Sequence, residues 1–206
     1  MTAEAGLRIV QLPLGAYQAN CYLVAREGGA TAAVVDPGDA PDVVLEELGR
    51  NGWTAAGVLV THGHIDHIGA VSAVARAAGA EVWMPRGEAD LLRELAGAPH
   101  DPDHLLDGGE TLSVAGIDFE ATLVPGHSPA SVAYLAEGHL FAGDVLFAGS
   151  IGRTDLAGGD MRTLLRSIGT LVGSCPADTV VLPGHGPPTT LGDELARNPF
   201  LKPLRA

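Results

Sequence analysis

The chain has 206 residues, 46% of them hydrophobic, which fits one domain over residues 1–206 and excludes a disordered protein. A net charge of −13, with Lys202 as the only lysine, argues against nucleic acid as a partner. The sequence shows no signal peptide and no apolar run of about 20 residues, so we expect a cytoplasmic protein without a membrane partner.

The first half of the chain alternates short β-branched runs with helical stretches. We expect strands over Leu7–Leu12, Cys21–Arg26, Thr31–Val35, Val58–Val60 and Glu81–Met84. We expect helices over Pro41–Arg50, from Ile68 to Ala78, and over Glu88–Ala96. The segment His100–Leu106 has a high polar content and is predicted to be a loop.

The second half of the chain is richer in hairpins. We expect strands over Thr111–Val114, Ile117–Val124, Ser131–Ala136, Leu140–Ala142 and Thr179–Leu182. An amphipathic helix is predicted over Met161–Val172, and a short helix followed by coil over Thr189–Ala206. Because several strands precede the first helix, we expect an α/β domain that is not a simple β-α-β series.

Four of the predicted strands run into a histidine or an aspartate. In chain order these strands are followed by His62, by His127, by Asp144 and by His185. Ligand sites in α/β proteins lie beyond the carboxyl ends of strands. A Pro-Gly turn precedes both His127 and His185 and aims each imidazole. The four strand ends therefore predict one shared polar site.

The strongest local motif is the segment 61–67, Thr-His-Gly-His-Ile-Asp-His. Residues two apart cannot share a helix face, so we predict a loop folded around a ligand. With the later strand ends, seven residues are candidate metal ligands: His62, His64, Asp66, His67, His127, Asp144 and His185. A zinc site rarely takes more than four protein ligands, so seven ligands with one bridging carboxylate predict two divalent ions about 3.5–4 Å apart. Zinc is the expected metal, with iron or manganese as alternatives.

Single members of this set also have simpler interpretations. Asp66 is a candidate N-cap of the following helix, and Asp36 is either a turn residue or a hydrogen-bond partner of a ligand histidine. Three further histidines are interpreted as solvated loop or turn residues: His100, His104 and His139. The seven residues together favour a metal site over separate caps and turns.

The order of these residues resembles the metallo-β-lactamase superfamily over most of the chain, from Cys21 to His185. The resemblance implies an α/β fold, a four-layer αββα sandwich with its site along one edge between two sheets. It also implies the ligand groups: His62, His64 and His127 for one metal, Asp66, His67 and His185 for the other, and Asp144 as the bridge. Within the superfamily the chain is most similar to short bacterial glyoxalase II, through residues 20–22, 36–38, 61–67, 143–147, 149–155 and 183–186.

The likeness to glyoxalase II implies hydrolysis of a small-molecule acyl-thiol substrate, such as a hydroxyacylglutathione-like thioester. Two cations lower the pKa of a bridging water from ~15.7 towards ~7, so a metal-bridging hydroxide is available to attack the thioester carbonyl. Asp66 is the candidate catalytic residue, which orients the nucleophile or accepts its proton. Arg153 is the candidate substrate-binding residue, because its guanidinium can pair with a substrate carboxylate.

Two features depart from full-length glyoxalase II. We expect no C-terminal helical domain that binds glutathione, and Arg153 and Asp155 stand where the long enzymes have a lysine and a tyrosine. The Gly-Arg-Thr-Asp run at 152–155 also resembles persulfide dioxygenases, in which His62, His127 and Asp144 would hold a single iron. A non-catalytic metal-binding module on the same fold is the third alternative.

Overall fold

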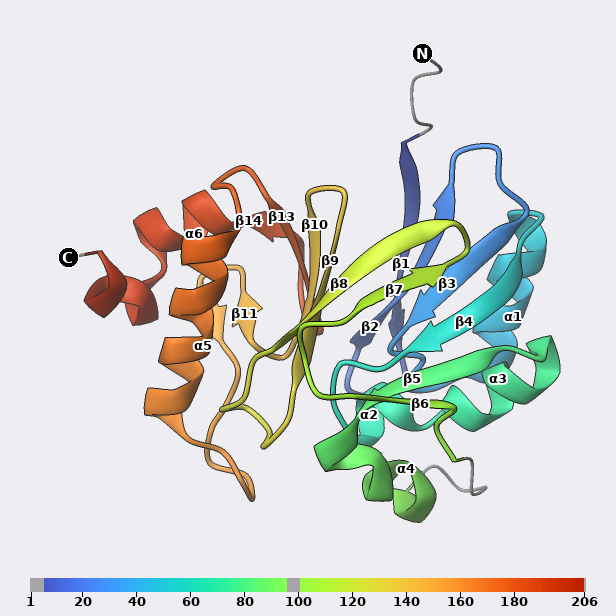
Figure 1. Ribbon diagram of the computed structural model, residues 1–206, viewed down its shortest axis with the longest axis horizontal. Coiled ribbons are helices and arrows are strands. Elements are labelled where there is room, and N and C mark those ends of the chain that lie inside the picture. Colours follow the sequence, from blue (N-terminus) through green and yellow to red (C-terminus); the bar gives the residue numbers. More distant parts are fainter. Residues whose placement is uncertain (1–5, 96–100, 206) are drawn as a thin grey trace.

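Two six-stranded sheets face each other at the centre of the protein (Figure 1). The computed structural model describes residues 6–95 and 101–205. The first sheet has the order β1 (Leu7–Leu14), β2 (Ala19–Arg26), β3 (Thr31–Val35), β4 (Thr54–Leu59), β5 (Glu81–Pro85), β6 (His104–Leu106). Strands β1 to β3 pair antiparallel and β3 to β6 pair parallel, so β3, β4 and β5 point their carboxyl ends to the same edge.

The second sheet carries the later ligand residues. Its order is β14 (Thr189–Thr190), β13 (Val180–Pro183), β10 (His139–Gly143), β9 (Val132–Ala136), β8 (Ile117–Leu123), β7 (Thr111–Val114). Strands β10 and β13 run parallel, and the other pairs are antiparallel. A small separate hairpin joins β11 (Leu146–Phe147) to β12 (Ser150–Ile151).

Helices cover the outer faces of both sheets (Figure 1). The first sheet is covered by α1 (Pro41–Arg50) and α3 (Val71–Ala78), and the second by α5 (Met161–Ser174) and α6 (Leu191–Arg197). The shorter elements are α2 (Ile65–Ile68), η1 (Arg86–Glu88), α4 (Ala89–Leu95) and η2 (Pro199–Leu204). Between the sheets lies a core with the buried aromatic residues Tyr22, Phe119, Tyr134 and Phe141. The predicted αββα sandwich is confirmed.

Two local predictions were wrong. The segment His100–Leu106 was expected to be a loop, but His104–Leu106 is an edge strand parallel to β5, while His100 lies outside the described residues. Its polar residues are compatible with a strand because His104 stacks on Trp83, with ring centroids 4.4 Å apart, and stays partly in solvent. Within the motif, residues from Ile65 onward form the short helix α2, so only its first part is a loop.

Some boundaries also moved. The predicted helix Glu88–Ala96 is split, since Glu88 closes a 3-10 turn and α4 begins at Ala89; Ala96 lies outside the described residues. The hairpin β11–β12 was not predicted, because two-residue strands carry no periodic signal. Among the described residues, no helix has the length and apolar character needed to cross a membrane.

Candidate metal centre

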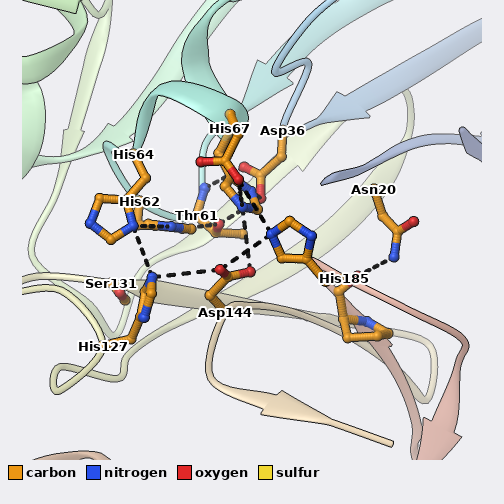
Figure 2. Close-up of polar contacts among 12 residues, drawn as sticks. Asn20, Asp36, Thr61, His62, His64, His67, His127, Ser131, Asp144 and His185 are labelled. Carbon is orange, nitrogen blue, oxygen red and sulfur yellow. Dashed lines mark hydrogen bonds and ion pairs between the residues drawn. The ribbon is translucent and has the colours of Figure 1, made fainter. Parts of the chain in front are cut away.

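The structure brings all seven candidate ligands to one edge of the sandwich, between the two sheets (Figure 2). The segment after β4 delivers His62 and His64, and α2 carries Asp66 and His67. The second sheet contributes the other three from the segments that follow β8, β10 and β13: His127, Asp144 and His185. The carboxyl ends of strands therefore converge there, as the sequence predicts.

Three imidazoles form the first ligand group. The Nε2 atom of His62 lies 3.1 Å from Nδ1 of His64, and Nε2 of His127 lies 2.9 Å from the same Nδ1 atom. Ligand nitrogens about 2.0–2.1 Å from a zinc ion stand about 3.3 Å apart in a tetrahedron. The spacing of His62, His64 and His127 is thus close to that needed for one cation.

The second group consists of Asp66, His67 and His185, whose ligand atoms lie within 4.8 Å of one another. Oδ2 of Asp66 is 3.3 Å from Nε2 of His185 and 3.8 Å from Nε2 of His67. Asp66 and His67 are consecutive residues in the first turn of α2, and the His67 imidazole faces Asp144, which follows a strand of the second sheet (Figure 2). A carboxylate with two imidazoles is a ligand set suited to zinc, iron or manganese.

Asp144 lies between the two groups. Its Oδ2 atom is 3.6 Å from Nε2 of His127 and 3.5 Å from Nε2 of His185. Its Oδ1 atom is 3.4 Å from Nε2 of His67, and both of these buried atoms lack a hydrogen-bond partner. Buried polar atoms without partners are costly, and a shared cation would satisfy both. The donor set therefore fits two divalent ions with Asp144 between them, although the individual ligand roles stay a prediction.

The ring nitrogens that point away from the centre are held by hydrogen bonds. Nδ1 of His67 lies 3.0 Å from Oδ2 of Asp36, so His67 donates from Nδ1 and keeps Nε2 free for a metal. Nδ1 of His127 likewise donates to the carbonyl oxygen of Arg153 at 2.8 Å. Thr61 donates its hydroxyl to Asp36 and accepts from Nδ1 of His62. These contacts select the tautomers that ligation requires.

Of the two interpretations of Asp36, a turn residue or a hydrogen-bond partner of a ligand histidine, the structure shows the hydrogen bond, which joins it to His67. Asp36 also lies close enough to His62 and His67 to form a third possible ligand group. Its oxygens are occupied, however, by the backbone N–H of Thr61 at 2.7 Å, by the Thr61 hydroxyl at 2.6 Å and by His67. We therefore interpret Asp36 as a residue that positions His67.

The two groups differ in their proton affinity. Burial lowers the pKa of His62 far below its usual value, and burial with neighbouring His127 lowers the pKa of His64, so both imidazoles are neutral and ready to bind a cation. Hydrogen bonds to Asp144 and Asp66 raise the pKa of His185 to about 9. The charge of Asp144, with the hydrogen bond to Asp36, likewise raises the pKa of His67 well above its usual value. A metal entering the second group must therefore displace protons from both imidazoles.

A family model of the metallo-beta-lactamase superfamily matches residues 14–185. The chain belongs to this superfamily. The probable metallo-hydrolase YqgX of Bacillus subtilis (strain 168) is 35% identical, over 93% of this chain and 96% of its own length. The hydroxyacylglutathione hydrolase GloC of Haemophilus influenzae is 34% identical, over 95% of this chain and 98% of its own length. The resemblance stated from the motif is confirmed at the level of the superfamily.

Solved structures of the superfamily have the same fold. The BLEG-1 B3 metallo-beta-lactamase has a TM-score of 0.88 and 40% identity, covering 95% of this chain and 100% of that one. TTHA1623 in a di-iron-bound form has a TM-score of 0.78 and 37% identity, with coverages of 93% and 100%. ETHE1 from Myxococcus xanthus has a TM-score of 0.83 and 27% identity, with coverages of 93% and 83%.

The loop that carries His185 is hydrogen-bonded to strand β2 of the first sheet. Asn20, near the start of β2, donates its backbone N–H to the carbonyl oxygen of Gly184, and its side-chain amide donates to the carbonyl oxygens of Pro183 and Gly186. The hydroxyl of Tyr22 donates to the same Pro183 oxygen at 2.7 Å. From the sequence alone, residues 20–22 are only part of a predicted strand and one of the stretches similar to glyoxalase II. Their role at His185 could not be predicted, because their hydrogen-bond partners lie more than 160 residues away.

Close packing leaves no room for a side chain at two glycines of the centre. A Cβ atom on Gly38 would overlap the backbone of Asp66, and one on Gly184 would overlap Oδ1 of Asp144 and lie 2.7 Å from Cε1 of His67. Both glycines thus permit the β3 and β13 loops to approach the ligands.

Two further charged residues, Glu88 and Arg153, lie close to the metal centre. Glu88 was predicted only as the start of a helix, yet its buried carboxylate bonds to both ligand-bearing loops. Arg153 lines the cleft beside the metal centre but is exposed and makes two hydrogen bonds to Asp155, at 2.7 and 2.8 Å. These bonds lower the pKa of Asp155 to about 2, so the pair is fully ionised at neutral pH. The role of Arg153 in substrate binding stays a prediction.

Proposed function

We propose that this metal-dependent hydrolase of the metallo-beta-lactamase superfamily hydrolyses thioesters, hydroxyacylglutathione-like substrates among them. The observation that carries the proposal is the pair of ligand groups on either side of Asp144, at the base of an open cleft. The similarity to GloC, a hydroxyacylglutathione hydrolase, supports a thioester as the substrate. The proposed partner is a small acyl-thiol molecule in the cytoplasm.

Divalent ions, when bound, would lower the pKa of a water molecule and polarise the thioester carbonyl. His62, His64 and His127 would hold one ion, and Asp66, His67 and His185 the other. We propose zinc for both; the di-iron form of TTHA1623 makes iron the main competitor. Metal analysis of the purified protein, together with reconstitution by zinc, iron or manganese, distinguishes these cases.

The chain's own residues orient and receive the proton of the attacking water. Asp66 is half-buried, and its carboxylate lines the cleft, where it can hold this water or accept its proton. A C–O bond forms to the acyl carbon, the C–S bond breaks, and the sulfur leaves as a thiolate that takes up a proton. Free thiols have a pKa near ~8.5, so the thiolate leaves without a dedicated general acid.

A persulfide dioxygenase is the alternative from another reaction class, and the likeness to ETHE1 is compatible with it. In that case His62, His127 and Asp144 would face a single iron. The complete second group of Asp66, His67 and His185 favours the hydrolase. One iron per chain with oxygen uptake on a thiol persulfide would overturn the hydrolase proposal.

The decisive experiment is the hydrolysis of S-lactoylglutathione and a panel of small thioesters by the metal-loaded protein, with metal content measured on the same sample. Asp66→Ala should abolish turnover, whereas Asp39→Ala, a change at an acid in the neighbouring cavity, should retain it. If the metal-loaded wild type turns over no thioester, the third alternative, a non-catalytic metal-binding module, is supported instead.

A further inference from the structure

An apolar cleft of about 740 Å³ opens directly onto the metal centre. His64, Asp66, His127, Asp144 and His185 form its polar base. Its walls include large apolar side chains: Tyr17, Ile65, Leu91, Leu95, Phe147 and Leu156. Exposed apolar surface beside a reactive site is typical of a ligand-binding surface.

The apolar walls are exposed to solvent rather than packed against the protein. Tyr17, Ile65, Leu95 and Leu156 are each between 40% and 70% exposed. They come from four separate segments: the turn after β1, helix α2, helix α4 and the loop before α5. An apolar molecule that covers these side chains would remove their surface from water, which is energetically favourable.

The charges of the cleft do not suit a strongly anionic ligand. Arg153 is the one Lys or Arg among the described lining residues, and both of its bonds go to Asp155. The adjoining cavity of about 240 Å³ adds Asp39 beside Asp66. A glutathione moiety carries two carboxylates, and the one basic side chain among the described lining residues is already paired with Asp155.

We propose that the substrate is a thioester that carries an aliphatic or aromatic chain, which packs against these walls while the thioester group lies at the metal centre. This inference rests on the proposed thioester hydrolysis and narrows it from glutathione thioesters to apolar ones. The chain can belong to the acyl group or to the thiol, and the chemistry that recognises it is the same. The reaction remains the addition of water across the C–S bond.

Two substrate series test the proposal on the metal-loaded protein. The first lengthens the acyl chain from acetyl to octanoyl on a small neutral thiol, and the second lengthens the thiol on an acetyl group. Each methylene that becomes buried should raise kcat/KM roughly twofold to fourfold in the series that matches the bound orientation. S-lactoylglutathione should be a poorer substrate than the best apolar thioester.

A pair of matched variants separates the cleft from general surface effects. Leu156→Asn should flatten the chain-length dependence, while Val43→Asn, at a similarly exposed residue of α1, should leave it unchanged. Hydrolysis with no dependence on chain length in either series, or a preference for S-lactoylglutathione, would overturn this inference but leave thioester hydrolysis standing. Failure to hydrolyse any thioester would overturn both.

A second feature stands on separate observations: the buried carboxylate of Glu88. One oxygen, Oε2, accepts from the backbone N–H of Gly63, between His62 and His64. The other, Oε1, accepts from the hydroxyl of Ser128, the residue after His127, and from the backbone N–H of Ala130 at 2.9 Å in the same loop. Glu88 thus ties together the two loops that carry the first ligand group, one from each sheet.

We infer that Glu88 is a positioning residue for the first metal, and that glutamine cannot replace it. A glutamine would place its NH2 group either against the N–H of Gly63 or against the N–H of Ala130, so one backbone bond is lost in either orientation. Glu194 provides a matched control. Its Oε2 accepts from two N–H groups, but its Oε1 faces only the Thr189 hydroxyl, which can also accept.

The test is a zinc titration against a competing chelator in a His185→Ala background, which leaves only the first group intact. Glu88→Gln should weaken zinc binding by roughly tenfold to a hundredfold, as changes behind metal ligands do, while Glu194→Gln should not. Should Glu88→Gln fail to fold, Ser128→Ala, which removes one of its three bonds, should show a smaller loss. Unchanged zinc affinity in the folded variant used would overturn the inference.

Discussion

Replacing Asp36 by asparagine tests how the second ligand group is oriented. Asp36 accepts from Thr61 N–H at 2.7 Å through Oδ1, and from the Thr61 hydroxyl and His67 Nδ1 through Oδ2. The asparagine oxygen can keep the bond to the Thr61 N–H, which leaves its NH2 group against Nδ1 of His67. His67 must then move its proton to Nε2, the atom that a metal requires.

The expected effect is a tenfold to hundredfold loss of metal affinity in the second group, or about 1.4–2.7 kcal/mol. Chelator competition measures this loss, and circular dichroism checks that the fold is kept. The control is Asp160→Asn, at the N-cap of α5, where Oδ1 accepts from Thr163 N–H and asparagine caps equally well. An Asp36→Asn protein that binds two metals with the affinity of the wild type would refute the proposed role of this hydrogen bond.

Three further predictions concern the same centre. Gly184→Ala should lose the second metal while the first is retained, because its Cβ would overlap Asp144 and crowd His67; metal stoichiometry measures this. Because the pKa of His185 is raised to about 9 and that of His67 is also raised, the metal affinity of the second group should rise at least tenfold per pH unit from pH 6 to 8, whereas a flat profile would contradict proton displacement. Asp155→Asn frees Arg153 and should raise kcat/KM severalfold for thioesters bearing a carboxylate, with neutral thioesters as the control.

The ligand-bearing strand ends could be predicted from the sequence because their signals are local. Each comes as a short apolar run followed within three residues by His62, His127, Asp144 or His185. A parallel arrangement of such strands brings their ends to one edge of a sheet. The same logic fails within segment 61–67, where the motif predicts a loop but helix α2 begins only three residues after the first ligand, His62.

The supporting contacts could not be predicted, because they join residues that are distant in the sequence. Glu88 bonds to Gly63 and Ala130, which lie 25 and 42 positions away, and no local pattern marks it as different from any other acidic helix start. The edge strand at His104–Leu106 has too few apolar residues for a period-2 signal, and its place depends on pairing with β5. Packing, rather than propensity, decides such elements.

The division of ligands between the two sheets has a consequence for the folded state itself. The first group combines His62 and His64 with His127, and the second combines Asp66 and His67 with His185. Each ion would therefore be coordinated by residues from both sheets. Binding that occurs only in the folded state adds about 4 kcal/mol of stability when the free ion exceeds its Kd a thousandfold. The concentration of free metal would then set the free energy of unfolding as well as the rate of catalysis.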